Sequence, residues 1–355
     1  MILSDVLASA NDCFGVLFRL EMALNKSTEG GAMKRIDAHL HVAADTPESQ
    51  ALMQRYELKF MNICVAEDAN GDWRHQAEAY MPLAKSQPDR FAWCTTFDLP
   101  RFDDPHYIDS VLQGLEQDFA DDAVACKIWK NFGMEVQHPD GAHVLPDDPL
   151  LHPILDYIAS QNKTLLMHIA EPMECWLPLQ EGSLHYGYYS QHPQWHMHGR
   201  TDKPSHQQLM VARDALTARY PTLRVVGAHF GSLEYDVDEV ASRFDKYPNF
   251  AVDISARLAD FALQDTNKVR QFCLKYQDRI LWGTDLVAGA VSRMPPEKQA
   301  RFLTYAATMY REYTEFFESD GDVQIERHTC RGLGLPNAVL EKIYLTNAQR
   351  WYPGM

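Results

Sequence analysis

From residue 34 onward, the chain alternates short, almost wholly apolar runs with longer stretches whose apolar residues recur at helical spacing. Apolar runs of this kind are typical of strands buried on both faces, and the stretches between them are typical of helices that cover a sheet. The alternation therefore predicts repeated strand–helix units around a parallel sheet. Eight strands are expected, over residues 35–41, 58–65, 91–97, 123–129, 163–169, 222–229, 249–255 and 279–285.

Helix-start signals support the second half of each unit. Asp148-Pro149 and Pro336-Asn337 place a proline where a helix begins. Eight units over roughly 300 residues predict an α/β fold of the (β/α)8 TIM-barrel type. An open doubly wound sheet is the alternative, but no G-x-G-x-x-G follows the first strand. Helices are expected over residues 47–56, 74–86, 105–119, 149–161, 206–219, 233–246, 265–276 and 337–350.

The chain divides into a short extension and one large domain. Residues 1–33 carry apolar side chains at helical spacing and predict an N-terminal helical extension, and residues 34–355 predict a single barrel. Two connections, 170–205 and 286–335, are too long to be simple turns, and the second contains a probable helix and a Gly-rich tail. Both follow strands at the C-terminal barrel face, where long loops form active-site lids and pocket walls. A dimer interface is the alternative role.

Composition excludes several classes of partner. The chain has 33 Lys and Arg against 49 Asp and Glu, a net charge of −16, which argues against nucleic acid and anionic membranes. Seven scattered cysteines without a C-x-x-C pair fit a reducing cytoplasm. No apolar run has the length of a membrane span, and the N-terminus lacks the basic region of a signal peptide. We therefore expect a cytoplasmic protein that acts on a small molecule, either alone or as a homodimer.

The first expected strand carries the motif Asp37-Ala38-His39-Leu40-His41. Because side chains alternate along a strand, His39 and His41 would share one face, with their Cβ atoms about 7 Å apart. Imidazole is the commonest protein ligand of zinc and related ions. Taken alone, the two histidines could equally be polar residues on an exposed face, so the interpretation depends on further ligands elsewhere.

Four later strands supply polar residues at or near their C-terminal ends, where catalytic side chains converge in a barrel. Each alone has a plain alternative, such as a helix cap for Asp285 or a solvated amine for Lys127. Together with the motif on the first strand, the histidines and the aspartate form one convergent set of nitrogen and oxygen ligands, which predicts a metal site. The four residues are Lys127, His168, His229 and Asp285.

On these residues, the chain resembles the amidohydrolase superfamily. It looks most like the amidohydrolase-related branch that includes aminocarboxymuconate-semialdehyde decarboxylase and other decarboxylases and hydrolases. The resemblance covers roughly residues 34–352 and includes the C-terminal run LEKIYLTNAQRWYP. This pattern is specific for metal chemistry in the superfamily, but it is not specific for a substrate.

The resemblance implies one divalent metal, most often Zn²⁺, with Mn²⁺ or Fe²⁺ as alternatives. It implies that His229 lies beside a metal-bound water, and that Asp285 acts as base and proton shuttle as well as ligand. A binuclear site bridged by a modified Lys127 is an alternative, and Lys130 could hold that bridging position instead. The implied metal ligands are His39, His41, His168 and Asp285.

Three further residues are candidates with open roles. Asp37 is expected on the same face as the two strand-one histidines, where it would orient one of them or form a structural hydrogen bond. Trp129 would wall the pocket or lie in the core. Arg257 would bind a substrate carboxylate or form a surface salt bridge. Of the polar residues in 170–205 (Glu171, His196, His198 and Arg200), none is singled out.

Three functions compete. The first is a hydrolase that cuts a C–N or C–O bond with metal-activated water. The second is a metal-dependent, non-oxidative decarboxylase of an aromatic or unsaturated acid, which would need an arginine such as Arg257 or Arg74 aimed at the carboxylate. The third is a barrel that binds metal without catalysis, against which the complete ligand set argues. Hydrolysis is the first expectation from the sequence.

Overall fold

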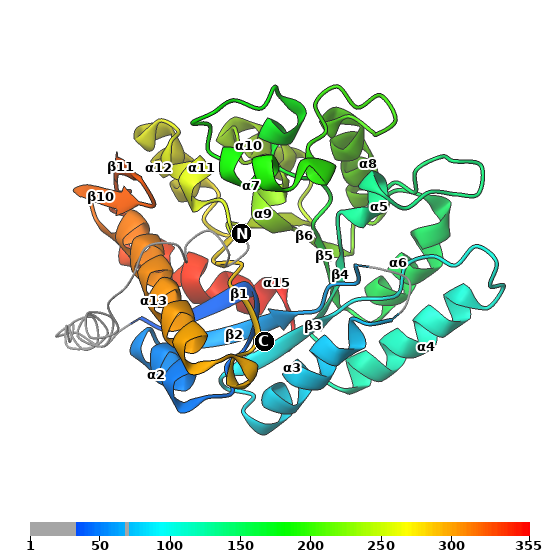
Figure 1. Cartoon of the computed structure of the whole chain (residues 1–355), viewed down its shortest axis with the longest axis horizontal. Helices are drawn as coiled ribbons and strands as arrows, with labels where there is room; N and C mark the ends of the chain where they lie inside the picture. The colour runs from blue at the N-terminus through cyan, green and yellow to red at the C-terminus, as the bar shows by residue number, and fades with distance from the viewer. Residues whose placement is uncertain (1–32, 68–70) are drawn as a thin grey trace.

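A curled parallel sheet forms the centre of the computed structural model, which describes residues 33–67 and 71–355. The strands follow one another in chain order from β1 (Arg35–Ala43) to β8 (Ile280–Leu281), and β9 (Val287–Ala290) pairs with the free edge of β1. The helices lie around the outside of this sheet (Figure 1). The predicted N-terminal helical extension falls, apart from Met33, outside the described residues.

All eight predicted strands are present, but most end earlier than the apolar runs suggested. The polar residues at the ends of these runs lie one to four residues beyond the strand ends: His168 after Met167, His229 after Gly227 and Asp285 after Leu281. The chain leaves the hydrogen-bonded ladder there to make the turns that carry them. The intermediate strands are β2 (Leu58–Ile63), β3 (Phe91–Thr95), β4 (Ala125–Ile128), β5 (Thr164–Met167), β6 (Arg224–Gly227) and β7 (Phe250–Asp253).

The predicted helices are also confirmed, with most boundaries within a few residues. A single-turn π-helix over Lys342–Thr346 joins α14 and α15 into the expected C-terminal helix. Among residues 33–67 and 71–355, four short α-helices were not predicted: α5 (Asn131–Met134), α7 (Tyr186–Gln191), α9 (Ala228–Gly231) and α11 (Leu258–Ala262). The predicted helices are α2 (Pro47–Arg55), α3 (Arg74–Ser86), α4 (Tyr107–Ala120), α6 (His152–Ser160), α8 (His206–Arg219), α10 (Val237–Lys246), α12 (Thr266–Lys275), α14 (Asn337–Glu341) and α15 (Asn347–Trp351).

Backbone hydrogen bonds bring the last strand of the sheet against the first. Ala38 N–H donates to Trp282 O at 3.0 Å, and Asp285 N–H donates to His39 O at 2.7 Å. The curled sheet thus has the architecture of a TIM barrel, as predicted. Its interior is filled by one apolar cluster that includes Ala348, Trp351 and Tyr352 from the C-terminal helix. The C-terminal run therefore packs into the interior of the sheet.

The two long connections contain more structure than the sequence suggested. Connection 170–205 contains α7 (Tyr186–Gln191) and two 3-10 turns. Connection 286–335 contains the predicted helix, α13 (Pro296–Glu318), but its Gly-rich tail forms a hairpin of β10 (Asp322–Ile325) and β11 (His328–Arg331). Arg327 at the hairpin turn donates to Ser183 O at 3.1 Å, so the two connections touch. Their role as lid or dimer interface stays a prediction.

No helix within residues 33–67 and 71–355 is long and apolar enough to cross a bilayer. The cysteines in the described part of the chain are free, and all but Cys330 are buried. They lie mostly among strand and helix residues of the core, where they act as small apolar side chains.

Gly227, at the end of β6, is expected to tolerate no larger side chain. A Cβ atom there would lie 2.8 Å from Gly231 Cα and 2.9 Å from Phe250 Cζ. We predict that Gly227→Ala lowers the free energy of unfolding by about 1–3 kcal/mol, measured by thermal or denaturant unfolding. Gly187→Ala is the matched control, because nothing lies within 4 Å of a Cβ there. Equal stability of the two variants would contradict the tight packing.

Candidate metal centre

A break in strand register aims the two strand-one histidines. The pairing of β1 with β2 shifts between Asp37 and Leu40, as in a β-bulge, which re-aims the side chains that follow it. After the shift, His39 and His41 lie together, with ring centroids 5.7 Å apart. His39 is fully buried and His41 is partly buried. The expectation that both imidazoles point the same way is confirmed.

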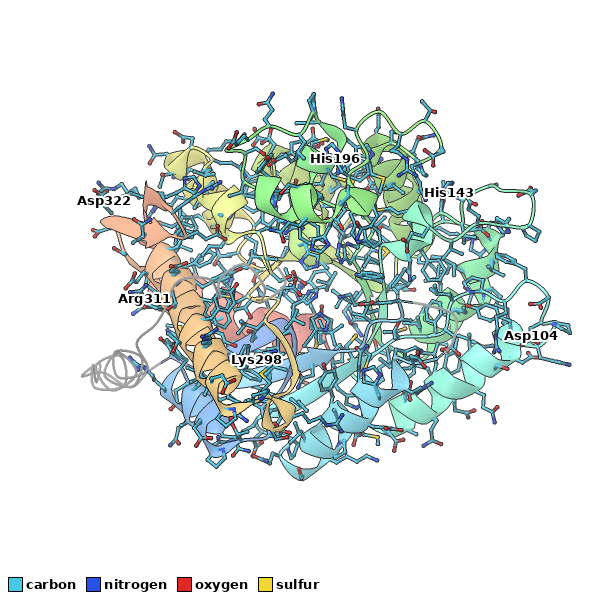
Figure 2. All side chains as sticks on the ribbon, viewed as in Figure 1. Asp104, His143, His196, Lys298, Arg311 and Asp322 are labelled. Carbon is cyan, nitrogen blue, oxygen red and sulfur yellow. The ribbon has the colours of Figure 1, made fainter. Side chains whose placement is uncertain are left out.

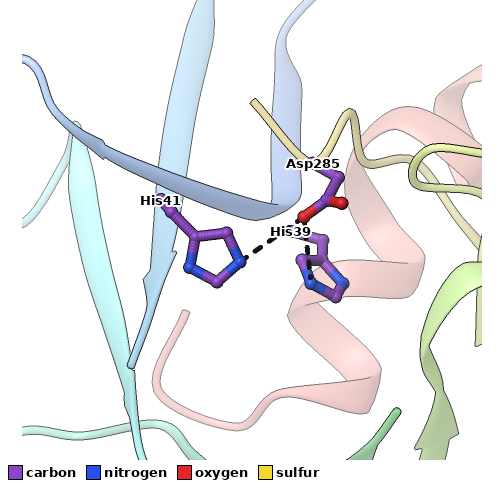
Figure 3. Close-up of side chains that lie close together, drawn as sticks. All are labelled: His39, His41 and Asp285. Carbon is purple, nitrogen blue, oxygen red and sulfur yellow. Dashed lines mark ion pairs between the residues drawn. The ribbon is translucent and has the colours of Figure 1, made fainter. Parts of the chain in front are cut away.

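Asp285 meets both imidazoles. One carboxylate oxygen lies 3.4 Å from His41 Nε2 and 3.7 Å from His39 Nε2 (Figure 3). The residue has a left-handed backbone with φ of 63°. Such a conformation costs about 1–3 kcal/mol in a residue other than glycine, and strain of this kind clusters at functional sites. The turn after β8 thus holds the carboxylate against the histidines at an energetic cost.

The two later histidines form a second contact beside the first. His168 and His229 have ring centroids 4.2 Å apart, and His229 lies 4.7 Å from the His39 ring. His229 also has a left-handed backbone, with φ of 55°. Burial lowers the pKa of both side chains well below the usual range, so both are neutral at pH 7. A neutral imidazole has a lone pair that a cation can use.

Hydrogen bonds fix which ring nitrogen of each histidine is free. His39 Nδ1 lies 2.8 Å from an Asp253 oxygen, and His41 Nδ1 lies 2.6 Å from Ile63 O. His229 Nδ1 lies 3.0 Å from Ser255 O. Each of these acceptors favours the tautomer with the proton on Nδ1, which leaves the lone pair on Nε2. That of His39 faces Lys127 Nζ at 3.1 Å.

This donor set suits a divalent cation. Ligand atoms of His39, His41 and Asp285 all lie within 4.8 Å of one another. The buried Nε2 of His168 has no hydrogen-bond partner in the described part of the chain, and such an orphan usually marks the place of a missing partner. A second grouping of His39, His229 and Asp253 is also close. It suits a cation less well, because its His39 and Asp253 atoms already bond to each other.

Asp253, at the end of β7, is the residue that sequence reasoning missed. Besides His39, its carboxylate accepts from the backbone N–H of His229 at 3.0 Å and from that of Ser255 at 3.1 Å. Although burial raises it, the pKa of Asp253 falls to about 2 because His39, the His229 imidazole and the Ser255 hydroxyl favour the charged form. The signal was present in the sequence, because FAVD is another apolar run that ends in a carboxylate.

The expectation that Asp37 faces the same side as the histidines is wrong. Its carboxylate accepts from Tyr310 OH of α13 at 2.9 Å and from Thr284 N–H at 3.0 Å. No hydrogen bond to an imidazole is present, although the backbone N–H of His39 lies 3.3 Å away. The register break after Asp37 is the reason, because it changes the alternation on which the expectation rested. Asp37 instead links β1 to the turn that carries Asp285.

The two candidate lysines of the fourth predicted strand have different partners. Lys127 is buried, and its Nζ lies 3.1 Å from His39 Nε2, so it belongs to the site. Lys130 forms a buried ion pair with Glu171, and its ammonium also lies 3.8 Å from the centre of the Trp195 ring. Lys127 is therefore the strand-four lysine that reaches the histidines.

Aromatic and basic side chains flank the histidines. Trp129 meets His168 edge-on at 6.4 Å between ring centres, which favours the pocket-wall interpretation. Arg257 carries a positive charge close enough to lower the pKa of both His168 and His229. It is half-buried, and within residues 33–67 and 71–355 no carboxylate lies within ion-pair distance of it. Arg74 instead pairs with Asp118 at 2.6 Å.

Most polar residues of connection 170–205 stay away from the histidines. His196 bonds to Leu177 O at 3.0 Å and lies in this connection beside α7 (Figure 2). His198 lies 3.2 Å from Trp176 O, and Arg200 pairs with Asp202 at 2.7 Å. Glu171, which binds Lys130, is the one of the four that is buried.

Comparison with known proteins gives a family and a fold. The chain matches a family model described as Amidohydrolase (Amidohydro_2) over residues 36–354. No curated protein sequence matches it. Among solved structures, a 2,6-dihydroxybenzoate decarboxylase complexed with 2,6-dihydroxybenzoate is 17% identical, with 90% of this chain and 99% of that chain covered and a TM-score of 0.50.

Two other similar structures differ in activity. A 5-carboxyvanillate decarboxylase from Novosphingobium aromaticivorans, complexed with manganese, is 13% identical over 92% of this chain and 97% of that chain, with a TM-score of 0.47. A probable 2-pyrone-4,6-dicarboxylic acid hydrolase from Acinetobacter baumannii is 11% identical over 90% and 99%, with a TM-score of 0.46. At such identities the likeness concerns the fold alone.

The geometry predicts how metal content responds to single substitutions. His39→Ala should abolish retention of a divalent metal, because it removes a buried imidazole that contacts Asp285. Asp253→Asn should weaken metal affinity about 10–100-fold, because it loosens the His39 ring without removing a ligand. Elemental analysis of protein purified without chelators, followed by competition with a chelator, measures both effects.

His143→Ala is the matched control, because His143 lies at the periphery of the molecule (Figure 2). It should leave metal content unchanged. Full metal content in His39→Ala would show that the ion, if any, binds elsewhere.

Proposed function

The chain belongs to the amidohydrolase-related family (Amidohydro_2), and on that premise we propose a metal-dependent, non-oxidative decarboxylase of an aromatic or unsaturated carboxylic acid. The observation that carries the proposal is Arg257, which follows β7, acts electrostatically on His168 and His229, and has a buried Nε with no partner among residues 33–67 and 71–355. Hydrolysis was the first expectation from the sequence. The arginine reverses that order, because a decarboxylase must hold the carboxylate it removes.

We propose that His39, His41, His168 and Asp285 hold one divalent cation, with Zn²⁺ favoured by the imidazole-rich set and Mn²⁺ or Fe²⁺ as alternatives. A cation bound there would polarise a substrate oxygen and lower the pKa of bound water. Lys127 would contribute a buried amine against His39. A binuclear site bridged through Lys127 remains a second arrangement.

Asp285 is the proposed proton carrier. Although burial raises it, the pKa of its carboxyl lies well below the ordinary value because His229 and His41 favour the charged form. The group is therefore ionised in the free protein, so the proton that it would pass to carbon must first be taken up from water. In decarboxylation the C–C bond breaks, its electron pair stays on the substrate carbon, and a proton forms the new C–H bond as CO2 leaves. His229 would orient the reacting groups through its free Nε2.

The remaining groups would bind and orient the acid. The Arg257 guanidinium is a planar, bidentate partner for a carboxylate, and its buried Nε has no hydrogen-bond partner within the protein. Trp129 offers a flat apolar wall for a planar ring beside His168. The chain has a net charge of −16, which repels anions in general. Binding of an anionic substrate would therefore depend on the local positive charge of Arg257.

Hydrolysis of a C–N or C–O bond is the second candidate. The observation that favours it is the position of Asp285, because a carboxylate beside two imidazole Nε2 atoms can also take a proton from an attacking water. A barrel that binds metal without catalysis is the least favoured, since an abandoned site would be expected to lose a ligand. Both catalytic alternatives, decarboxylation and hydrolysis, act on a small-molecule substrate.

The test is a substrate screen scored for two products. Aromatic and unsaturated carboxylic acids are scored for CO2 release, and amides, lactones and esters are scored for hydrolysis. We expect CO2 release from at least one acid and its loss after metal removal by a chelator. Hydrolysis without CO2 release from any acid would contradict the decarboxylase.

Arg257→Ala should raise KM for the acid about tenfold or more, because it removes a charge-assisted hydrogen bond to the carboxylate. Arg257→Lys should recover part of this loss, since it restores the charge but not the bidentate geometry. Arg219→Ala, on the exposed end of α8, is the matched control and should change nothing. An unchanged KM in Arg257→Ala would remove the main support for the proposal.

A further inference from the structure

Glu234 is a buried carboxyl group that the proposed mechanism does not use. It is 2% exposed and follows the left-handed turn after β6. One oxygen accepts from Met173 N–H at 2.7 Å, but the buried Oε2 has no hydrogen-bond partner. An unsatisfied buried oxygen costs about 1–3 kcal/mol, so its retention calls for an explanation.

Arg257 is the nearby cation that also lacks partners. One guanidinium nitrogen donates to Ala256 O at 2.7 Å, whereas Nε is buried and unpartnered. The carboxylates whose charges act on Arg257 are Asp260, Glu234 and Glu171. A buried carboxyl oxygen of Glu234 and a buried guanidinium nitrogen of Arg257, both without a hydrogen-bond partner, therefore lie in one region.

The other acids of this region are already paired. Asp260 lies 2.8 Å from His185 Nε2, and Glu171 binds Lys130 and accepts from Tyr189 OH at 3.0 Å. Glu234 is thus the acid in this group without a cation of its own. Its ionisation decides how much of the positive charge of Arg257 is compensated within the protein.

Hydrogen bonds between three connections fix the arrangement. Ser232 Oγ donates to Ala170 O at 2.8 Å, which ties the turn after β6 to the connection after β5. Gln264 Nε2 donates to Glu234 O at 2.7 Å, which ties the same turn to the segment after β7. The same Gln264 Nε2 lies 3.4 Å from Asp260 O, three residues after Arg257, so the turn that carries Glu234 is tied to the segment that carries Arg257.

Burial and the charge of Asp260 raise the pKa of Glu234 to about 7, and Arg257 opposes the rise. The carboxyl group therefore changes charge in the neutral range. When ionised, it compensates Arg257 and repels an incoming carboxylate. When protonated, it leaves the guanidinium uncompensated and offers an O–H donor.

We propose that Glu234 is a positioning residue that controls the availability of Arg257, so that a carboxylic acid binds together with one proton taken up by Glu234. The inference rests on the proposed role of Arg257 as the carboxylate contact. The binding step consumes one proton. The free protein has ionised Glu234 and binds the anion of the acid together with one proton, which gives a complex with protonated Glu234.

Proton uptake on binding is the direct readout. Calorimetric titration of the purified protein with 2,6-dihydroxybenzoate, in buffers of different ionisation enthalpy, counts the protons taken up. We expect uptake to approach one proton above pH 8 and to vanish near pH 5.5, and we expect Kd to rise about tenfold per pH unit above the Glu234 pKa. Wild-type binding without uptake overturns the inference, and this measurement needs no variant.

Variants show which residue takes up the proton, and they distinguish a failure of this inference from a failure of the proposed function. Glu234→Gln mimics the protonated form, so it should bind the acid with a Kd independent of pH and with no uptake, although His185, Asp260, Lys130, Glu171 and Tyr189 all remain. Glu181→Gln, at an exposed position of connection 170–205, is the matched control and should behave as wild type.

Arg257→Ala should lose binding at every pH. Unchanged binding in Arg257→Ala, or no binding of the acid to the wild-type protein at any pH, would contradict the proposed function itself. Loss of binding in Arg257→Ala with wild-type proton uptake in Glu234→Gln would overturn the role of Glu234 alone.

Discussion

The hydrogen bond between Asp253 and His39 is the constraint on which the rest of the site depends. A charged carboxylate buried in the barrel is stable only when donors surround it. His39 Nδ1, the backbone N–H of His229 and the backbone N–H of Ser255 are those donors. One side chain therefore fixes the ring of one histidine and the backbone of another, and it leaves His39 Nε2 directed at Lys127 and Asp285. The site is built from the end of β7 as much as from β1.

Strained and unsatisfied groups converge around this network. His229 and Asp285 both have left-handed backbones, and His168, Glu234 and Arg257 each have a buried polar atom without a partner. Each feature costs free energy, and a fold selected for stability alone would have little reason to keep them together. Their concentration at the C-terminal ends of β5 to β8 is explained if a cation and an anionic substrate satisfy these groups. Binding of a cation and a substrate would then explain strained and unpaired groups that packing alone does not explain.

The sequence predicted the fold well because the fold rests on periodicity. Buried parallel strands are apolar runs, and eight of them alternating with helices leave few alternatives to a barrel. The register break in β1 could not be predicted, since strict alternation is the only rule that sequence offers for a strand. Because of that break, the Asp37 side chain points to the face opposite His39 and His41, whereas the two histidines stay on one face. Asp253 and Glu234 were missed because a carboxylate after an apolar run looks like a helix cap until its partners are known. Their roles depend on contacts between strand ends far apart in sequence.

We propose above all that three imidazoles and a carboxylate bind a catalytic cation. Anomalous X-ray diffraction at the absorption edge of the bound metal tests it most directly, on crystals of protein purified without chelators. We predict a peak coordinated by Nε2 of His39, His41 and His168 and by the carboxylate of Asp285. The absence of a peak, or a peak between His39, His229 and Asp253 alone, would contradict the claim.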